Sequence, residues 1–302
     1  MKIATTIGEM YPFAGSPAEA IALYKDTGFR YLDYSFYSVV MKSNDPFMQD
    51  NWQEGVYAGK EMAEKLGFQF VQAHAPAGAF RGDNSEKLLL GTIRSIEACG
   101  ILGIENMVIH SGLFPECKYP EDELAYFKTN EPFFRALIPA MEKNNVRILF
   151  ENTTIKHCPD SAYFPILGKD LNAFVKFMDH PLFGAAWDVG HANMDGIDQY
   201  KEIMEMGPNL KAVHIHDNDG IKDQHTAPFM GTMDYDAFMR GLLDSGYKGY
   251  FTLESDGFFK FGRNKELNGP LAHTPLEVKK AALSMLYTIS KAILTTYDAF
   301  EE

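Results

Sequence analysis

The feature that most constrains this 302-residue chain is a repeated alternation between short apolar runs and longer segments of helical period. The first run is KIATTIG (2–8), and SPAEAIALYKDTG (16–28) follows it with helical spacing. The last run, GYFTLESD (249–256), precedes a C-terminal helix expected at about 275–298. Eight such pairs follow one another, with no linker between them. Strands separated by single crossover helices are typical of a parallel sheet.

Eight strand–helix pairs favour closure into one α/β domain over residues 1–302, a single (β/α)8 TIM barrel. The main alternative is an open, doubly wound sheet. That fold usually carries an early glycine-rich phosphate turn, and the sequence contains neither GxGxxG nor GxxxxGK[ST]. We therefore expect the closed barrel and no nucleotide cofactor.

Charge and cysteine content narrow the partners and the location of the chain. A net charge of −13 opposes non-specific binding to nucleic acid. No signal peptide or uninterrupted apolar span is visible, so we expect no membrane partner. The three cysteines (Cys99, Cys117 and Cys158) form no CxxC pair, which favours a reduced, cytoplasmic protein. The apolar last helix leaves open whether it closes its own barrel or packs against a second subunit in a homo-oligomer.

Ionisable residues follow the expected strands at the points where the strands end. In a parallel barrel these ends face one mouth, so groups far apart in sequence converge there. A single His or Glu at a strand end is more often solvated than a ligand, and the prediction therefore depends on convergence. The residues are His74, His110, Glu151, Asp188, His191, His214, His216 and Glu254, with Asp33 in the second strand and Asp223 and His225 in the loop after the seventh. By contrast, His157, His180 and His273 lack such context and are expected at the surface.

Side-chain alternation predicts which groups enter the barrel. In VHIHD, the apolar Val213 and Ile215 share one strand face, so the two histidines share the other. The same alternation turns Glu151 of ILFE and Glu254 of FTLE inward, and Asp188 of WD joins them. Carboxylates crowded in a partly dry mouth repel one another.

A divalent cation removes this repulsion. Carboxylates with one imidazole suit Mn²⁺, Co²⁺, Mg²⁺ or Zn²⁺ in a site that stays open to substrate oxygens. We expect His216 to be the imidazole ligand and His214 to be a pocket group beside it. The sequence does not decide between these ions.

At these residues the sequence resembles the xylose isomerase-like barrel superfamily, which includes sugar and sugar-phosphate isomerases and epimerases, inosose-processing enzymes, ketose 3-epimerases and endonuclease IV. The resemblance extends over nearly the whole chain. It implies a metal held by Glu151 in FENT, Asp188 in WDVGH, His216 in HIHDND and Glu254 in LESD. HIHDND resembles the family element H-x-[KN]-D, which places His216 on the metal and Asp219 at the close of the element.

A second segment also resembles the family. DQH followed by PFMGTMDY is similar to D-x-H…G-x-G-x-[IL]-D, and it contains Asp223 and His225. The chain departs from this pattern at the first glycine, where it has Phe229.

The resemblance implies a metal-dependent isomerase or epimerase of a sugar, sugar phosphate or inosose. Proton transfer alpha to a metal-chelated carbonyl would pass through an enediolate, with Glu151 and Glu254 as the acid–base pair. His74 and His191 are expected to bind hydroxyls. Trp187 and aromatic residues of the loops either cover a sugar face or pack in the interior. These aromatic residues are Tyr34, Phe36, Phe80, Phe258 and Phe259.

Two other functions stay open. Every ligand position of the trinuclear zinc site of endonuclease IV has a candidate here, which gives an alternative zinc-dependent phosphodiesterase or AP endonuclease. The isomerase is favoured over it because HAP is followed by Ala-Gly-Ala rather than by an aromatic wedge, and because the chain is acidic. A barrel that binds a sugar without turnover is the third possibility.

Overall fold

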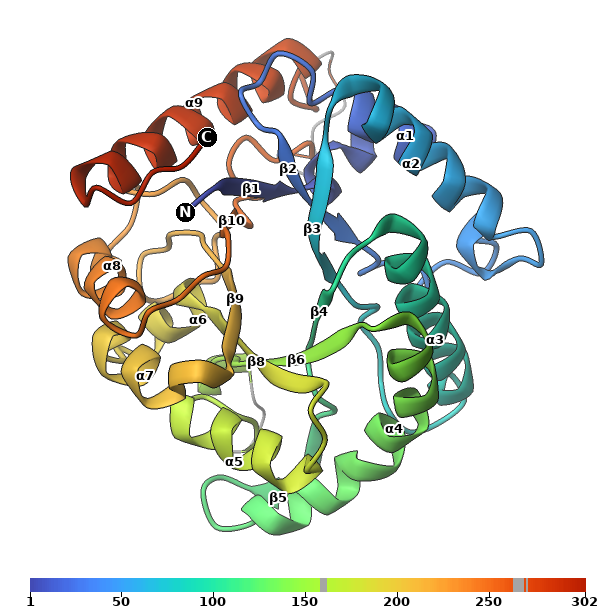
Figure 1. Ribbon diagram of the computed structural model, residues 1–302, viewed down its shortest axis with the longest axis vertical. Coiled ribbons are helices and arrows are strands. Elements are labelled where there is room, and N and C mark those ends of the chain that lie inside the picture. Colours follow the sequence, from blue (N-terminus) through green and yellow to red (C-terminus); the bar gives the residue numbers. More distant parts are fainter. Residues whose placement is uncertain (158–161, 263–268, 270) are drawn as a thin grey trace.

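The structure is a computed structural model that describes residues 1–157, 162–262, 269 and 271–302, so Cys158 lies outside the described residues. Parallel strands form a barrel with helices around it, which confirms the predicted fold (Figure 1). The order of the eight strands around the barrel is β10, β1, β2, β3, β4, β6, β8, β9. Their bounds are β1 Ile3–Thr6, β2 Tyr31–Ser35, β3 Gln69–His74, β4 Asn106–Ile109, β6 Arg147–Glu151, β8 Phe183–Asp188, β9 Leu210–His214 and β10 Phe251–Leu253.

The barrel closes between its last two strands. Ile215, just beyond β9, forms a parallel bridge with Leu253 of β10. The Glu254 amide donates to the Ile215 carbonyl at 2.9 Å. The two chain ends also meet, because the Glu301 amide donates to the Met1 carbonyl at 3.0 Å. Closure places the end of β10 directly beside the end of β9.

The helices form the outer ring seen in Figure 1. Their bounds are α1 Pro17–Ala22, α2 Gln53–Leu66, α3 Ser85–Leu102, α4 Glu123–Asn144, α5 Gly168–Met178, α6 Val189–Met194, α7 Gln199–Met206, α8 Tyr235–Asp244 and α9 Leu276–Thr296. Short 3-10 helices are η1 Ile7–Phe13, η2 Pro46–Met48, η3 Ile155–His157 and η5 Gly207–Asn209. No helix among the described residues is long and apolar enough to cross a lipid bilayer.

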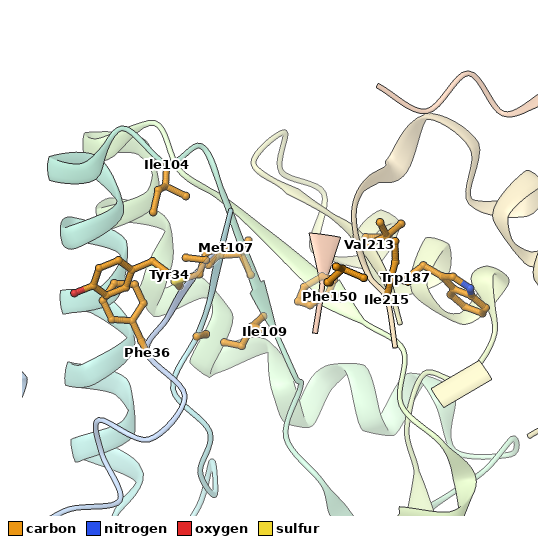
Figure 2. Close-up of a cluster of buried hydrophobic side chains, with 14 of the residues drawn as sticks. Tyr34, Phe36, Ile104, Met107, Ile109, Phe150, Trp187, Val213 and Ile215 are labelled. Carbon is orange, nitrogen blue, oxygen red and sulfur yellow. The ribbon is translucent and has the colours of Figure 1, made fainter. Parts of the chain in front are cut away.

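Strand alternation divides the apolar core into two layers. A small cluster of Val108, Leu149, Ala186 and Ala212 fills the barrel interior. The larger cluster lies between strands and helices and includes Phe150, Trp187 and Val213, as Figure 2 shows. These four inner residues locate the site. In a strand, the side chain two positions further along points to the same side, so the residue two positions after each of them also points into the barrel, closer to its mouth. Those side chains are His110, Glu151, Asp188 and His214.

One strand end agrees with the sequence-based expectation and one local feature was not expected. β8 ends at Asp188, as expected, and α6 begins at once, with the Asp188 carboxylate accepting from the His191 amide at 2.7 Å. The loops after β4 and β6 also form an additional antiparallel pair, β5 Phe114–Lys118 with β7 Ala162–Tyr163. This pair stands outside the barrel sheet.

Candidate active site

The mouth of the barrel is a cavity of about 860 Å³, lined by side chains from the strand ends and the loops that follow them. Most of the predicted site residues meet in or directly below it. Those that line the cavity are His74, His110, His191, Asp223, His225 and Glu254. Glu151, Asp188, His214 and Asp33 are buried beneath.

The central group consists of Glu151, Asp188, His214 and Glu254. One ligand-type atom from each lies within 4.8 Å of the others. The His214 Nδ1 is 2.5 Å from the Glu151 Oε1 and 3.5 Å from the Glu254 Oε2. Three carboxylates and one imidazole therefore share one small space.

The histidine in this group is His214, whereas the sequence-based prediction had chosen His216 as the ligand. In the sheet, Asp188 of β8 is directly paired with His214 of β9, so these two side chains lie at the same height. His216 points to the same side but lies beyond the end of the strand. Its Nε2 is 3.1 Å from both Asp188 oxygens, and it stacks on His225 with ring centroids 3.8 Å apart.

The same shift changes the assignment of the H-x-[KN]-D element. Asp217 is fully buried and accepts from the Asn218 and Met233 amides at 2.9 and 3.2 Å. Asp219 is exposed, and its carboxylate accepts from the loop amides of Ile221 and Lys222. The element therefore fits residues 214–217 better than 216–219, with a histidine at its third position.

A second group of histidines surrounds Asp223. The Asp223 Oδ2 is 3.2 Å from the His225 Nε2 and 3.5 Å from the His191 Nε2, and the Asp223 Oδ1 is 3.8 Å from the His216 Nε2. His157 joins this group, since its ring centroid is 5.8 Å from that of His191. From the sequence, His157 is expected at the surface. It is exposed, but it lies at the rim of the mouth.

Two more histidines contact Glu151 from the other side. The His110 Nε2 is 2.7 Å and the His74 Nε2 is 3.7 Å from the Glu151 Oε2. His110 is partly exposed to the cavity, whereas His74 is buried and its Nδ1 donates to the Ala75 carbonyl at 2.8 Å. Glu151 is thus surrounded by three imidazoles.

Two buried residues that the sequence analysis did not single out orient this centre. The Gln72 amide donates to the Asp33 Oδ2 at 2.8 Å, and this oxygen lies 3.5 Å from the His214 Nε2. Asn152 bridges β6 and β8, because it accepts from the Asp188 amide at 2.6 Å and donates to the Asp188 carbonyl at 2.9 Å. Both residues were detectable in principle, since Gln72 alternates with His74 and Asn152 directly follows Glu151.

Trp187 does not join the site. It directly precedes Asp188 in β8 and so points to the opposite face of the strand, toward the helices (Figure 2). Its indole nitrogen donates to the Gln199 side chain of α7 at 2.7 Å. Tyr34 and Phe36 also belong to the outer core, and Phe80 packs on Phe133.

Two positions near the site depend on their residue type, one through its backbone conformation and one through its lack of a side chain. Phe229, which replaces the first glycine of G-x-G, has a φ of +71°, in the left-handed region that glycine adopts easily. Gly190 has no room for a side chain, since a Cβ there would lie 1.9 Å from the His216 ring. This close approach lets α6 start beside His216.

The electrostatics of the centre follow from burial and mutual contact. Burial opposes ionisation of Asp188, but His191 and His216 outweigh it and lower the Asp188 pKa to about 2. Burial likewise opposes the charged form of His214, yet Glu151 and Glu254 raise its pKa well above the usual value. For His191, burial is outweighed by Asp188 and Asp223, which raise its pKa to about 10. Protons on the imidazoles therefore compensate the carboxylates.

The residues fit a divalent cation. The donor atoms are the carboxylate oxygens and imidazole nitrogens that such ions prefer. Among the described residues, the buried Asp223 Oδ1 and His216 Nδ1 receive no hydrogen bond. The Glu151 Oε2 also lacks a well-directed hydrogen bond, although the His110 Nε2 lies close to it. A cation in the central group would satisfy the Glu151 Oε2, and a cation beside it would satisfy the Asp223 Oδ1.

The fold is a parallel (β/α)8 barrel, and histidines and carboxylates cluster at its mouth. These two features place the chain among barrel proteins whose site could hold a divalent cation. Residues 21–269 match the family described as xylose isomerase-like TIM barrel. The chain belongs to the xylose isomerase-like TIM barrel family.

The chain is also similar to individual proteins. Uncharacterized protein MJ1311 of Methanocaldococcus jannaschii is 26% identical over 207 residues, which cover 65% of this chain and 68% of that protein. A fructoselysine 3-epimerase of Escherichia coli is 42% identical over 50 residues, only 17% of this chain and 18% of the epimerase. The crystal structure of a D-tagatose 3-epimerase-like protein superposes with a TM-score of 0.73 at 17% identity, covering 99% of this chain and 98% of that one.

Proposed function

We propose that this chain is a divalent-metal-dependent isomerase or epimerase of a small carbohydrate, with Glu151, Asp188, His214 and Glu254 as the residues that hold the ion. The observation that carries the proposal is the convergence of these four side chains below the mouth. The names of the similar proteins, a fructoselysine 3-epimerase and a D-tagatose 3-epimerase-like protein, support carbohydrate chemistry. His214 replaces the earlier expectation for His216.

When bound, the ion supplies Lewis-acid polarisation of a carbonyl and its neighbouring hydroxyl. Glu254 is the better-placed base, because 23% of its side chain is exposed toward the cavity, against 1% for Glu151. It removes the proton alpha to the carbonyl. The Glu151 Oε1 and the Glu254 Oε2 both face the His214 Nδ1. Glu151 returns a proton that it takes from His110, whose Nε2 lies 2.7 Å from the Glu151 Oε2, and Glu254 gives up its proton to solvent in the cavity.

The surrounding histidines bind and orient the substrate. His110 and His191 line the cavity, and 33% of the His110 side chain is exposed there. Asp33 lies on the far side of His214 and fixes the direction of its ring.

The test is solvent exchange of the proton alpha to the carbonyl. Several ketoses and inososes are incubated in D₂O with Mn²⁺, and deuterium incorporation is followed by NMR. Glu254→Gln should slow exchange by about 10²- to 10⁴-fold, since it removes a proton acceptor. Glu61→Gln, at an exposed position of α2, is the matched control and should leave exchange unchanged. Unimpaired exchange in Glu254→Gln contradicts the assignment.

A second candidate is the zinc-dependent phosphodiesterase. It is favoured by one observation: His74 and His110 contact Glu151, and His191 and His225 contact Asp223, so donor groups for further ions flank the central one. Against it stands the net charge of −13, which opposes approach to DNA. Efficient incision of a duplex containing an abasic site, with Zn²⁺ present, would replace the first proposal by this one.

A further inference from the structure

A second cavity adjoins the mouth of the barrel. It measures about 320 Å³ and lies between the η1–α1 segment and the long loop from β2 to α2. Tyr11, Ser35, Ser38 and Lys42 line both this cavity and the mouth. The proposed chemistry at the mouth makes no use of this space.

The loop that forms one wall is held in place by α3. The Lys87 ammonium donates to the Val40 and Lys42 carbonyls at 2.7 and 2.9 Å. The Arg94 guanidinium donates to the Phe47 and Gln49 carbonyls, both at 3.0 Å. Two side chains of α3 thus hold four backbone carbonyls of the loop, so this wall of the cavity has a fixed conformation.

Aromatic rings make up much of the lining. Phe47 packs edge-on against Trp52 with ring centroids 5.2 Å apart and lies 5.0 Å from Phe36. Opposite them, the Tyr11 hydroxyl donates to the Ser35 carbonyl at 2.9 Å, which presents the Tyr11 ring at the border between the two cavities. Ring faces of this kind bind flat or aliphatic groups.

The charges at this cavity disfavour an anionic group. Asp45 and Glu54 line it, whereas Lys42 is the cation among its described lining residues. The Asp45 carboxylate is already used by the Phe47 amide at 3.0 Å, and Glu54 accepts from Asn51 at 3.0 Å. A phosphate here would meet carboxylates and ring faces.

We propose that this cavity is a subsite for an uncharged aromatic or aliphatic arm of the substrate, so that the preferred substrate is a conjugated ketose rather than a free one. The sugar occupies the mouth, and the arm passes Ser38 and Lys42 to lie against Phe47 and Trp52. This inference rests on the proposed function for the statement that the substrate contains a ketose. The statement that an uncharged arm occupies the second cavity is independent of it.

The test compares D-fructose with 6-O-benzyl-D-fructose in the D₂O exchange assay with Mn²⁺. The wild-type chain should favour the benzyl compound by at least about tenfold in kcat/KM, because the ring leaves water on binding. Gly55→Trp should reduce this ratio to about one: Gly55 lines the cavity, and a Cβ there meets no atom within 4 Å, so the new side chain enters open space. A wild-type ratio near one, or a ratio that survives in Gly55→Trp, overturns the proposal.

The matched control is Gln53→Trp, which adds the same side chain to the same helix at an exposed position outside the cavity lining. It should keep the wild-type ratio. If neither compound exchanges its proton, the proposed function fails, and saturation-transfer NMR on the benzyl protons still tests the subsite. Transfer that is present in the wild type and lost in Gly55→Trp supports the subsite; its absence in the wild type overturns it.

Discussion

At the scale of single residues, His214 and His216 lie on the same side of the chain yet have different partners. His214 contacts Glu151 and Glu254, whereas His216 contacts Asp188 and Asp223. Alternation alone predicts that both side chains point inward, but it does not predict how far along the barrel axis each one lies. That position depends on the pairing of Asp188 with His214 and on where β9 ends, and both are properties of the folded sheet.

This difference predicts unequal effects of two substitutions. His214→Gln should weaken Mn²⁺ binding by more than about 100-fold, because it removes a ligand. His216→Gln should weaken it by about tenfold, since His216 orients Asp188 instead. Mn²⁺ titrations followed by electron paramagnetic resonance measure both. The control variant His180→Gln, whose imidazole contacts Glu142 instead, should bind as the wild type does. A stronger effect of His216→Gln than of His214→Gln contradicts the proposed assignment.

The proton balance of the centre gives a pH prediction. Without an ion, the carboxylates hold the pKa of His214 above its usual value and that of His191 at about 10, so both imidazoles are protonated at pH 7. A nitrogen must lose its proton before it binds a cation. Cation binding should therefore release protons at pH 7, and the affinity should rise with pH. Calorimetric titration in two buffers of different ionisation enthalpy measures the release; equal heats in both buffers contradict it.

At the scale of elements, the strands and helices were predictable because their periodicity is strong, and β8 illustrates both the success and the limit. Its apolar run identified the strand, but the immediate start of α6 depends on the Asp188 carboxylate capping the His191 amide. The pair β5 and β7 was missed because FPECK buries only its first and fourth residues, so it has no strand alternation. The position of Trp187 could have been predicted, since it neighbours Asp188.

A buried ion pair connects three elements on the mouth side. Lys279 of α9 and Glu9 of η1 lie 2.7 Å apart with side chains almost fully buried, and the Lys279 ammonium also donates to the Phe258 carbonyl at 2.8 Å. Lys279→Met leaves the Glu9 charge buried and unpaired. It should lower the free energy of unfolding by about 3–5 kcal/mol.

Urea denaturation of the chelator-treated protein measures this loss. The double variant Glu9→Gln/Lys279→Met removes the unpaired charge and should recover most of the stability. Lys280→Met, one position along α9, is the control and should change it by less than about 0.5 kcal/mol. A single variant as stable as the double variant contradicts the role of the pair.

At the scale of the whole molecule, the site exists because the closed barrel brings together residues from Glu151 to Glu254. The sequence predicted the closed barrel and most of the residues at its mouth, because acidic and imidazole groups follow buried strands.

A bound ion should connect β6, β8, β9 and β10 and so stabilise the native state. At a concentration about 100 times the dissociation constant, Mn²⁺ should add about 2.7 kcal/mol and raise the Tm by roughly 5 °C. Calorimetric scans with and without chelator measure this shift, and an unchanged Tm contradicts it.

The most direct test of the central claim is elemental analysis of the purified protein after loading with Mn²⁺ and removal of free ion. We predict one tightly held equivalent in the wild type, and none in the His214→Gln variant. A wild-type chain that retains no ion, or a His214→Gln variant that retains a full equivalent, would contradict the account.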